Sequence, residues 1–145
     1  MGFAERFELG RGFENQIARM FLKMGWSVIP FFELGGPGKE APRYRRHVLP
    51  DMLCHRNGVR VWVECKVKRR MWSAPATGIH EQLYEDYLAV QKASNIPVWL
   101  MVKDGEEVYG GRLDRLEVYA KGRPVQGRPS VLFKVPGNFR RVYSK

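Results

Sequence analysis

Two acidic residues and one lysine lie on either side of a short turn in the middle of the chain. Asp51 follows a proline in the run LPDMLCHR, while Glu64 and Lys66 stand two residues apart in the run VRVWVECKV. Both runs are rich in apolar and β-branched residues, and Asn57-Gly58 between them is the strongest short signal for a β-hairpin. Because side chains alternate across a strand, Glu64 and Lys66 share one face, and the hairpin turns the chain back towards Asp51.

This combination of residue types can support phosphate chemistry. Two carboxylates brought together repel each other, which raises a pKa or recruits a cation. Carboxylate oxygens with spare coordination positions suit Mg²⁺ or Mn²⁺. Such an ion can activate a water molecule, and an adjacent lysine can position the nucleophile or stabilise charge on the phosphoryl oxygens. The pattern therefore predicts phosphodiester hydrolysis. The alternative is a hairpin with solvated charges, in which Glu64 pairs with Lys66 on the surface.

The same residues carry a resemblance to a known family. Pro50-Asp51, followed after the turn by Glu64-Cys65-Lys66, resembles the PD-(D/E)XK motif of the restriction-endonuclease-like nucleases. The resemblance implies that Asp51 and Glu64 bind the divalent metal, that the backbone carbonyl of Cys65 is a further ligand, and that Lys66 is the catalytic lysine. Members of the family often add an acid from the first helix, and Glu14 is the matching residue. For Glu14 the alternative is an ordinary acid near a helix N-terminus.

The elements that must position these residues can be predicted from the apolar pattern. We expect a helix over residues 12–24, a strand over 26–34, and then a loop rich in glycine, proline and basic residues. The hairpin strands follow at 48–56 and 59–67, with the valine face of the second strand packed inward and the Glu64 face opposite. A second helix, capped by Thr77, is expected to run to about Ser94, and a compact apolar strand at 96–102 is predicted to be central.

The order helix, strand, hairpin, helix, strand predicts an α/β fold with a mixed central sheet flanked by helices. It matches the αβββαβ core that the resemblance implies. We expect a single domain over residues 1–145, with its core at roughly 12–103 and a basic C-terminal extension at 104–145. The pattern is weaker in that extension, where residues 130–135 are predicted to form the last strand.

One edge of the second helix carries His80, Tyr84, Tyr87 and Gln91. Several families with the nuclease fold place a Gln or Tyr of this helix near the metal. Tyr87 and Gln91 are the matching residues, and His80 shares their edge. Half-buried packing with hydrated hydroxyl groups is the alternative for the tyrosines.

The chain is strongly basic, with 25 Lys and Arg against 15 Asp and Glu and a formal net charge of +10. This excess favours a polyanionic partner, with nucleic acid ahead of an anionic membrane surface. Lys68, Arg69 and Arg70 directly follow the strand with Glu64 and are predicted to meet phosphates, and Trp72 to stack on a base. Arg43, Arg45 and Arg46 receive the same interpretation. Solvated basic loops are the alternative.

Several protein classes are disfavoured by what the sequence lacks. Cys54 and Cys65 are the only cysteines, and no Cys/His cluster has metal-ligand spacing, so a zinc module or a disulfide scaffold is not expected. A reduced, cytoplasmic (intracellular) setting fits this composition. No apolar run is long enough to span a membrane, and the charged N-terminal residues do not form a secretory signal, so no membrane partner is expected.

These patterns together predict a nuclease that uses Mg²⁺ or Mn²⁺ to hydrolyse DNA phosphodiester bonds. A short single domain leaves little room for a sequence-reading module. It therefore favours selectivity for a DNA structure, whether duplex, branched or single-stranded, and a role in repair or recombination. Within the enzyme class the alternative is a homodimeric endonuclease similar to Holliday junction resolvases. A different class is a non-catalytic nucleic-acid-binding module on a nuclease fold, and a weaker possibility is a structural protein with an acidic partner.

Overall fold

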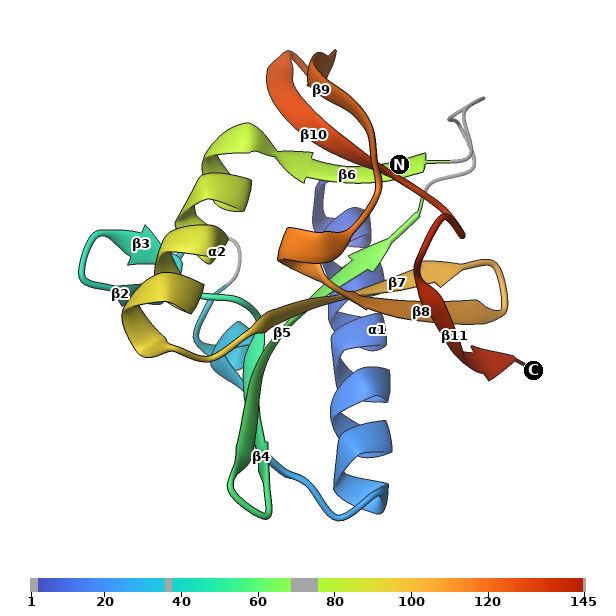
Figure 1. Cartoon of the computed structure of the whole chain (residues 1–145). Helices are drawn as coiled ribbons and strands as arrows, with labels where there is room; N and C mark the ends of the chain where they lie inside the picture. Colours follow the sequence, from blue (N-terminus) through green and yellow to red (C-terminus); the bar gives the residue numbers. More distant parts are fainter. Residues whose placement is uncertain (1–2, 36–37, 69–75, 145) are drawn as a thin grey trace.

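The computed structural model describes residues 3–35, 38–68 and 76–144. Its centre is a six-stranded sheet in the order β1-β4-β5-β7-β8-β11, flanked by the helices α1 (Phe3–Lys23) and α2 (Glu81–Ser94) (Figure 1). β5 and β7 run parallel and the other neighbours antiparallel, which confirms the predicted mixed α/β sheet. Its strands are β1 (Ser27–Ile29), β4 (Met52–Arg56), β5 (Val59–Val67), β7 (Val98–Asp104), β8 (Glu107–Arg112) and β11 (Arg140–Ser144).

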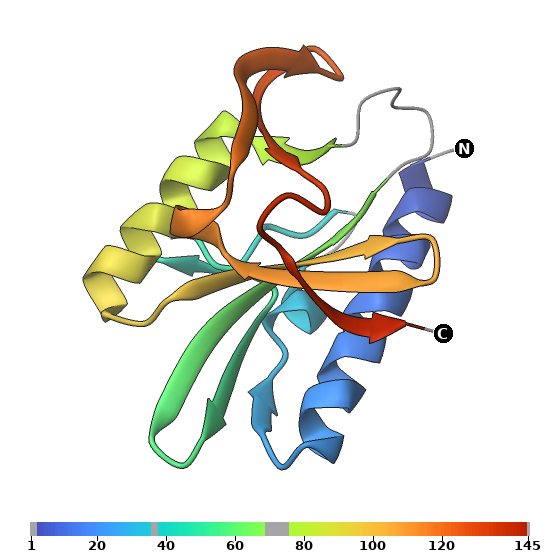
Figure 2. The same cartoon turned by 45° about the vertical axis from the view of Figure 1, so that its right-hand side comes forward.

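Two smaller sheets and two short 3₁₀ helices complete the described part of the chain. The antiparallel sheet β6-β10-β9 lies at the top of Figure 1, and in Figure 2 its β9–β10 hairpin stands away from the central sheet. A two-stranded hairpin, β2–β3, lies beside α2. The elements are β2 (Arg43–Tyr44), β3 (His47–Val48), β6 (Ala76–His80), β9 (Val118–Val125), β10 (Arg128–Lys134), η1 (Phe31–Leu34) and η2 (Leu113–Arg115). Neither described helix is long and apolar enough to cross a membrane.

The central strand β5 is buried on both faces, because each face meets a separate apolar cluster. Trp62 points into the cluster that contains Tyr87 and Val90 of α2. Val63 and Cys65, on the other face, join the cluster that contains Phe13 and Ile17 of α1. The valine face packs inward as expected, whereas the burial of Trp62 on the opposite face was not predicted. A strand covered by a helix on each side buries both sets of alternating side chains.

The turn between β4 and β5 forms as the sequence predicts. Asn57 and Gly58 have φ values of 50° and 79°, and the positive sign at both positions is that of a type I′ turn. The register pairs Met52 with Val63 and Arg56 with Val59. Continuing that register by one residue sets Asp51 opposite Glu64. The local turn thus decides which two acids face each other.

Two expected elements differ from the observed ones. The strand predicted over residues 26–34 stops at Ile29, because Pro30 supplies no N–H, and the chain continues as η1. The second helix begins at Glu81 rather than Thr77, because Thr77 lies in β6, which pairs with β10. Thr77 and Ile79 are β-branched and favour a strand once a partner is available.

The ends of the chain also differ from expectation. The first helix begins at Phe3, ahead of the predicted residue 12. The strand expected over 130–135 is β10, but it is not the last strand, since β11 follows and pairs with β8. β7 lies inside the sheet between β5 and β8, as predicted for a central strand. Two of the missed elements, β6 and β11, depend on strand partners that are distant in sequence.

Strand β6 packs closely against β10 at Gly78. A Cβ at Gly78 would lie 2.6 Å from the backbone oxygen of Val131 and 2.5 Å from Cδ2 of Leu132. We expect Gly78→Ala to lower the free energy of unfolding by about 1–3 kcal/mol, because backbone must move to make room. Urea denaturation measures the change. The matched control is Gly12→Ala in α1, where a Cβ meets nothing within 4 Å and the stability is expected to rise by about 0.5–1 kcal/mol. Equal effects at the two glycines would contradict the tight approach.

Candidate active site

Asp51 and Glu64 each accept a hydrogen bond from a backbone N–H on the opposite side of the β4–β5 hairpin. The N–H of Asp51 donates to Oε1 of Glu64 at 3.1 Å, and the N–H of Cys65 donates to Oδ2 of Asp51 at 2.7 Å. Each carboxylate therefore satisfies a peptide group of the opposite strand. These two bonds continue the hairpin ladder through side chains and hold the carboxyl groups close together.

The proximity of the two carboxyl groups is unfavourable when both are ionised. Burial raises the pKa of Asp51 well above its usual value, and the charge of Glu64 raises it further. Burial also raises the pKa of Glu64, although hydrogen bonds to its charged form and the charge of Lys66 oppose the shift. The pair therefore retains a proton to a higher pH than isolated carboxyl groups. A bound cation would relieve the same repulsion.

Helix α2 contributes a third group to the carboxylate pair. The hydroxyl of Tyr87, a buried side chain, donates to Oε2 of Glu64 at 2.8 Å. Burial raises the pKa of Tyr87 well above its usual value, and the charges of Glu64 and Asp51 act in the same direction. The phenol therefore stays protonated and remains a donor. Both oxygens of Glu64 are thus oriented, one by the hairpin and one by the helix.

Lys66 and Glu14 complete the group of charges around the hairpin. The positive charge of Lys66 lowers the pKa of both Asp51 and Glu64. The negative charge of Glu14, on α1, raises the pKa of both Glu64 and Cys65, so the first helix brings this acid within electrostatic reach. Asp51 and Glu64 are thus linked by hydrogen bonds across the hairpin, and Lys66 and Glu14 act on them through their charges. Their roles in metal binding and catalysis remain predictions.

The other two residues expected on the α2 edge lie in different surroundings. Gln91 accepts from the N–H of Val98 through Oε1 at 2.9 Å and donates to Asp114 at 3.1 Å. Its amide thus joins the start of β7 to η2 and does not reach the carboxylates. His80 directly precedes α2, and its Nδ1 lies 3.2 Å from the hydroxyl of Ser130. The sequence gives no local signal for Ser130, because it lies on β10, fifty residues away.

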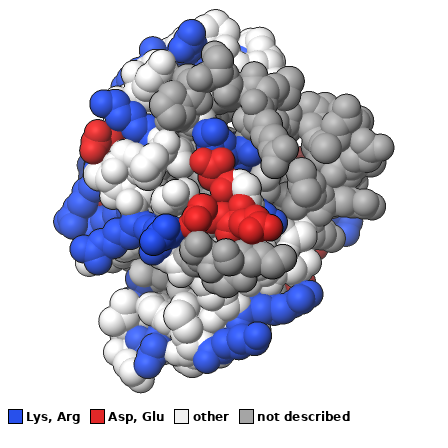
Figure 3. Space-filling view, turned by 90° about the vertical axis from the view of Figure 1, so that its right-hand side faces the viewer, with Lys and Arg blue, Asp and Glu red and all other residues white. Residues whose placement is uncertain are grey.

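The residues predicted to contact nucleic acid differ in exposure and in pairing with acids. Arg45 and Arg46 are exposed in the β2–β3 turn. Nζ of Lys68 lies 3.8 Å from Oδ1 of Asp104, the last residue of β7, so an acid offsets its charge. Figure 3, which views the molecule from the side of the β7–β8 turn, shows acidic side chains gathered among Lys and Arg. Arg69, Arg70 and Trp72 lie outside the described residues.

The donor atoms at the hairpin are of the kind that a hard divalent cation prefers. Mg²⁺ in proteins is commonly held by one or two carboxylates, with water and substrate phosphate as the remaining ligands. Asp51 and Glu64 supply such a pair. Within the described residues, no three His, Cys, Asp or Glu side chains are spaced to enclose a metal ion. The site therefore fits an ion that shares its coordination sphere with solvent and substrate.

Comparison with known proteins supports the fold and leaves the family open. Neither a family model nor a curated protein matches the sequence. Among solved structures, the chain is similar to Hjc, a Holliday junction resolvase from the archaeal hyperthermophile Archaeoglobus fulgidus, with a TM-score of 0.58 and 13% sequence identity. The match covers 83% of this chain and 86% of the resolvase chain. The chain therefore shares its fold with this resolvase over most of both lengths.

The repulsion between the carboxyl groups has a consequence for stability. Burial and the charge of Glu64 raise the pKa of Asp51 in the folded state, so folding binds a proton that the unfolded chain releases. Stability is therefore lost as the pH rises from the unfolded pKa through the raised folded pKa. Asp51→Asn keeps an oxygen for the N–H of Cys65 and removes the charge. We expect the free energy of unfolding at pH 8 without metal to rise by about 0.5–2 kcal/mol. Urea denaturation in EDTA at pH 4 and pH 8 measures it. A loss of stability at pH 8 would contradict the repulsion.

Proposed function

We propose that the protein is a metal-dependent nuclease that hydrolyses DNA phosphodiester bonds. The observation that carries the proposal is the pair of carboxyl groups joined across the β4–β5 hairpin, with Lys66 two residues beyond Glu64. The shared fold with a Holliday junction resolvase supports it. The strongly basic composition supports a polyanionic substrate.

Each residue of the hairpin has a role in this proposal. Asp51 and Glu64 hold Mg²⁺ or Mn²⁺, with the carbonyl of Cys65 as a further ligand and Glu14 as an additional acid. The metal, when bound, supplies a Lewis acid for the phosphate and its attacking water. Lys66 stabilises the charge that develops on the phosphoryl oxygens. Tyr87 does not contact the phosphate in this scheme, and it positions Glu64 through the hydroxyl donor.

The substrate proposed first is a branched DNA, the four-way junction above all. The resolvase with the same fold carries that substrate in its name. A homodimer is part of the same proposal, because two cuts placed symmetrically on a four-way junction require two sites. Selectivity for structure suits a domain of this size better than recognition of a long sequence.

Lys66→Ala is the direct test of the catalytic role. We expect cleavage of labelled DNA in Mg²⁺ or Mn²⁺ to fall by about 10²–10³-fold, because the charge that develops on the phosphoryl oxygens loses a cationic side chain. Gel analysis of single strand, duplex, flap and four-way junction substrates measures the rate and identifies the preferred structure. EDTA should abolish cleavage by the wild type. Lys92→Ala, at an exposed position of α2, is the charge-matched control.

A non-catalytic nucleic-acid-binding module is the second candidate. It is favoured by the net charge of +10, which suits binding to a polyanion whether or not a bond is cut. Binding that falls steeply with salt, without cleavage of any substrate in either metal, would establish it. Cleavage that Lys66→Ala leaves unchanged would instead overturn the assignment of the site.

Tyr87→Phe tests the positioning of Glu64. Loss of the hydroxyl leaves one carboxylate oxygen without its buried donor, so Glu64 should bind metal more weakly. We expect the Mg²⁺ concentration for half-maximal cleavage to rise about tenfold, with a smaller effect at saturating metal. The control is Tyr84→Phe on the same helix, whose ring packs 6.0 Å from that of Phe133. A merely structural role for the Tyr87 hydroxyl would lower thermal stability without moving the metal dependence.

A further inference from the structure

A second feature lies beside the carboxylate site and is not part of it. A cavity of about 600 Å³ opens between the β2–β3 hairpin, the first turns of α2 and the start of β10. This volume is in the range of pockets that hold small ligands. The side chains that give it its chemistry are Arg43, Arg46, His47, His80, Asp86 and Arg128.

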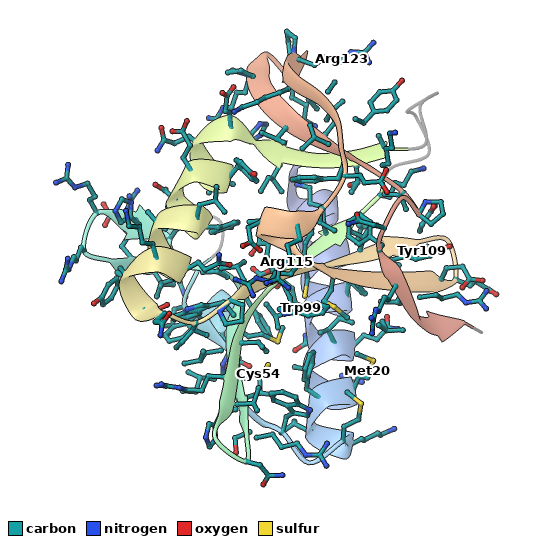
Figure 4. The ribbon with its side chains drawn as sticks, in the orientation of Figure 1. Met20, Cys54, Trp99, Tyr109, Arg115 and Arg123 are labelled. Carbon is teal, nitrogen blue, oxygen red and sulfur yellow. The ribbon has the colours of Figure 1, made fainter. Side chains whose placement is uncertain are left out.

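The positive charge of this basic cavity comes from two segments that are distant in sequence. Arg43 and Arg46 belong to the β2–β3 hairpin, and Arg128 begins β10 directly after the turn of the β9–β10 hairpin. Figure 4 shows Arg123 near the outer end of the same hairpin. Residues 118–135 contain no acid, so no carboxylate within that hairpin offsets Arg128. Guanidinium groups converging from separate elements are typical of phosphate recognition.

One acid lies in the wall of the basic cavity, and its charge is already engaged. Asp86 accepts from the N–H of Val48 and from Gln82, each at 3.3 Å, and its Oδ1 lies 3.3 Å from Nδ1 of His47. These contacts fasten the β2–β3 hairpin to α2. Asp86 therefore positions Arg43 and Arg46, and its charge opposes an anion less than a free carboxylate would.

His80 connects the basic cavity to the carboxylate site. Burial lowers the pKa of His80, and the charges of Lys66 and Arg128 lower it further. The residue thus lies within electrostatic reach of the lysine of the site and of an arginine of the cavity. Its Nδ1 is engaged by Ser130, and its Nε2 makes no hydrogen bond to the described residues. A ligand that spans both places would pass His80.

We propose that the basic cavity is a phosphate-binding subsite, which holds a phosphate group of the nucleic acid at a distance from the bond that is cut. Arg43, Arg46 and Arg128 supply the charge, and His80 supplies a further polar contact. The proposal rests on the proposed function, because it takes nucleic acid as the ligand. The phosphate can be an internal diester or a terminal monoester, and the chemistry of recognition is the same.

The test compares two exposed arginines of the basic cavity with one outside it. The side chains of Arg46 and Arg128 can be removed together while the backbone oxygens that accept from Arg43 and Ser130 remain. Arg60→Ala, at an exposed position near the turn of the β4–β5 hairpin, is the control, first alone and then paired with Arg56→Ala to match the change of two charges. Binding of labelled DNA in EDTA is measured by fluorescence anisotropy at several salt concentrations.

We expect Arg46→Ala/Arg128→Ala to weaken binding about tenfold and to reduce the slope of log K against log salt by about one. The matched control should change binding less than threefold. Three duplexes distinguish a terminal phosphate from an internal one. The first has a 5′-phosphate, the second has a 5′-hydroxyl, and the third has both ends closed by hairpins. A loss confined to the 5′-phosphate duplex identifies a terminal group, and an equal loss on all three identifies an internal one.

Equal weakening by the cavity pair and the control pair would overturn the subsite. Cleavage assays on the same proteins keep the two proposals apart. If the wild type binds DNA through Arg46 and Arg128 but cleaves no substrate, the subsite stands and the nuclease proposal fails. If the wild type cleaves DNA and the two arginines have no special effect on binding, the nuclease proposal stands and the subsite fails. Binding of a polyglutamate peptide that depends on both arginines, without such dependence for DNA, would assign the cavity to an acidic protein segment and overturn the proposal.

Discussion

The reciprocal bonding of Asp51 and Glu64 across the β4–β5 hairpin is the constraint on which the candidate site depends. Each carboxylate accepts a peptide N–H from the opposite strand, so the two acids cannot move apart without leaving backbone donors unsatisfied. Tyr87 then fixes the second oxygen of Glu64 from helix α2. A pair of carboxyl groups that would otherwise separate is thus held close enough to attract a cation.

The two carboxyl groups place unfavourable charge in the interior of the protein, so the strands that hold them must be rigid. β5 meets this requirement, because it is buried on both faces and lies between β4 and β7 inside the sheet. The clusters around α1 and α2 close over the two faces, and each helix also sends one polar group towards the carboxylates. The apolar core therefore stabilises the fold while the site remains electrostatically strained, which is a common cost of a functional site.

The positive charge of the chain is distributed around this acidic centre by tertiary contacts. Asp104 pairs with Lys68 near the β7–β8 turn. Asp86 is engaged by the β2–β3 hairpin, and Arg43 and Arg46 of that hairpin line the basic cavity. Some basic side chains, such as Lys68, are thus paired with an acid, whereas others, such as Arg43 and Arg46, line the cavity. The composition alone indicates a polyanionic partner, but this arrangement decides where an anion can approach.

The sequence by itself determined the β-hairpin at Asn57-Gly58, the face that Glu64 shares with Lys66, and the order of helices and central strands along the chain. These features depend on residues close in the chain, such as Asn57-Gly58 and the alternation in β5. Only the tertiary structure decided that both faces of β5 are buried, that Thr77 lies in a strand, that Tyr87 rather than Gln91 reaches Glu64, and that Arg128 lines a cavity with Arg43. Each of these depends on packing between segments far apart in sequence, and local propensity carries no information about such partners.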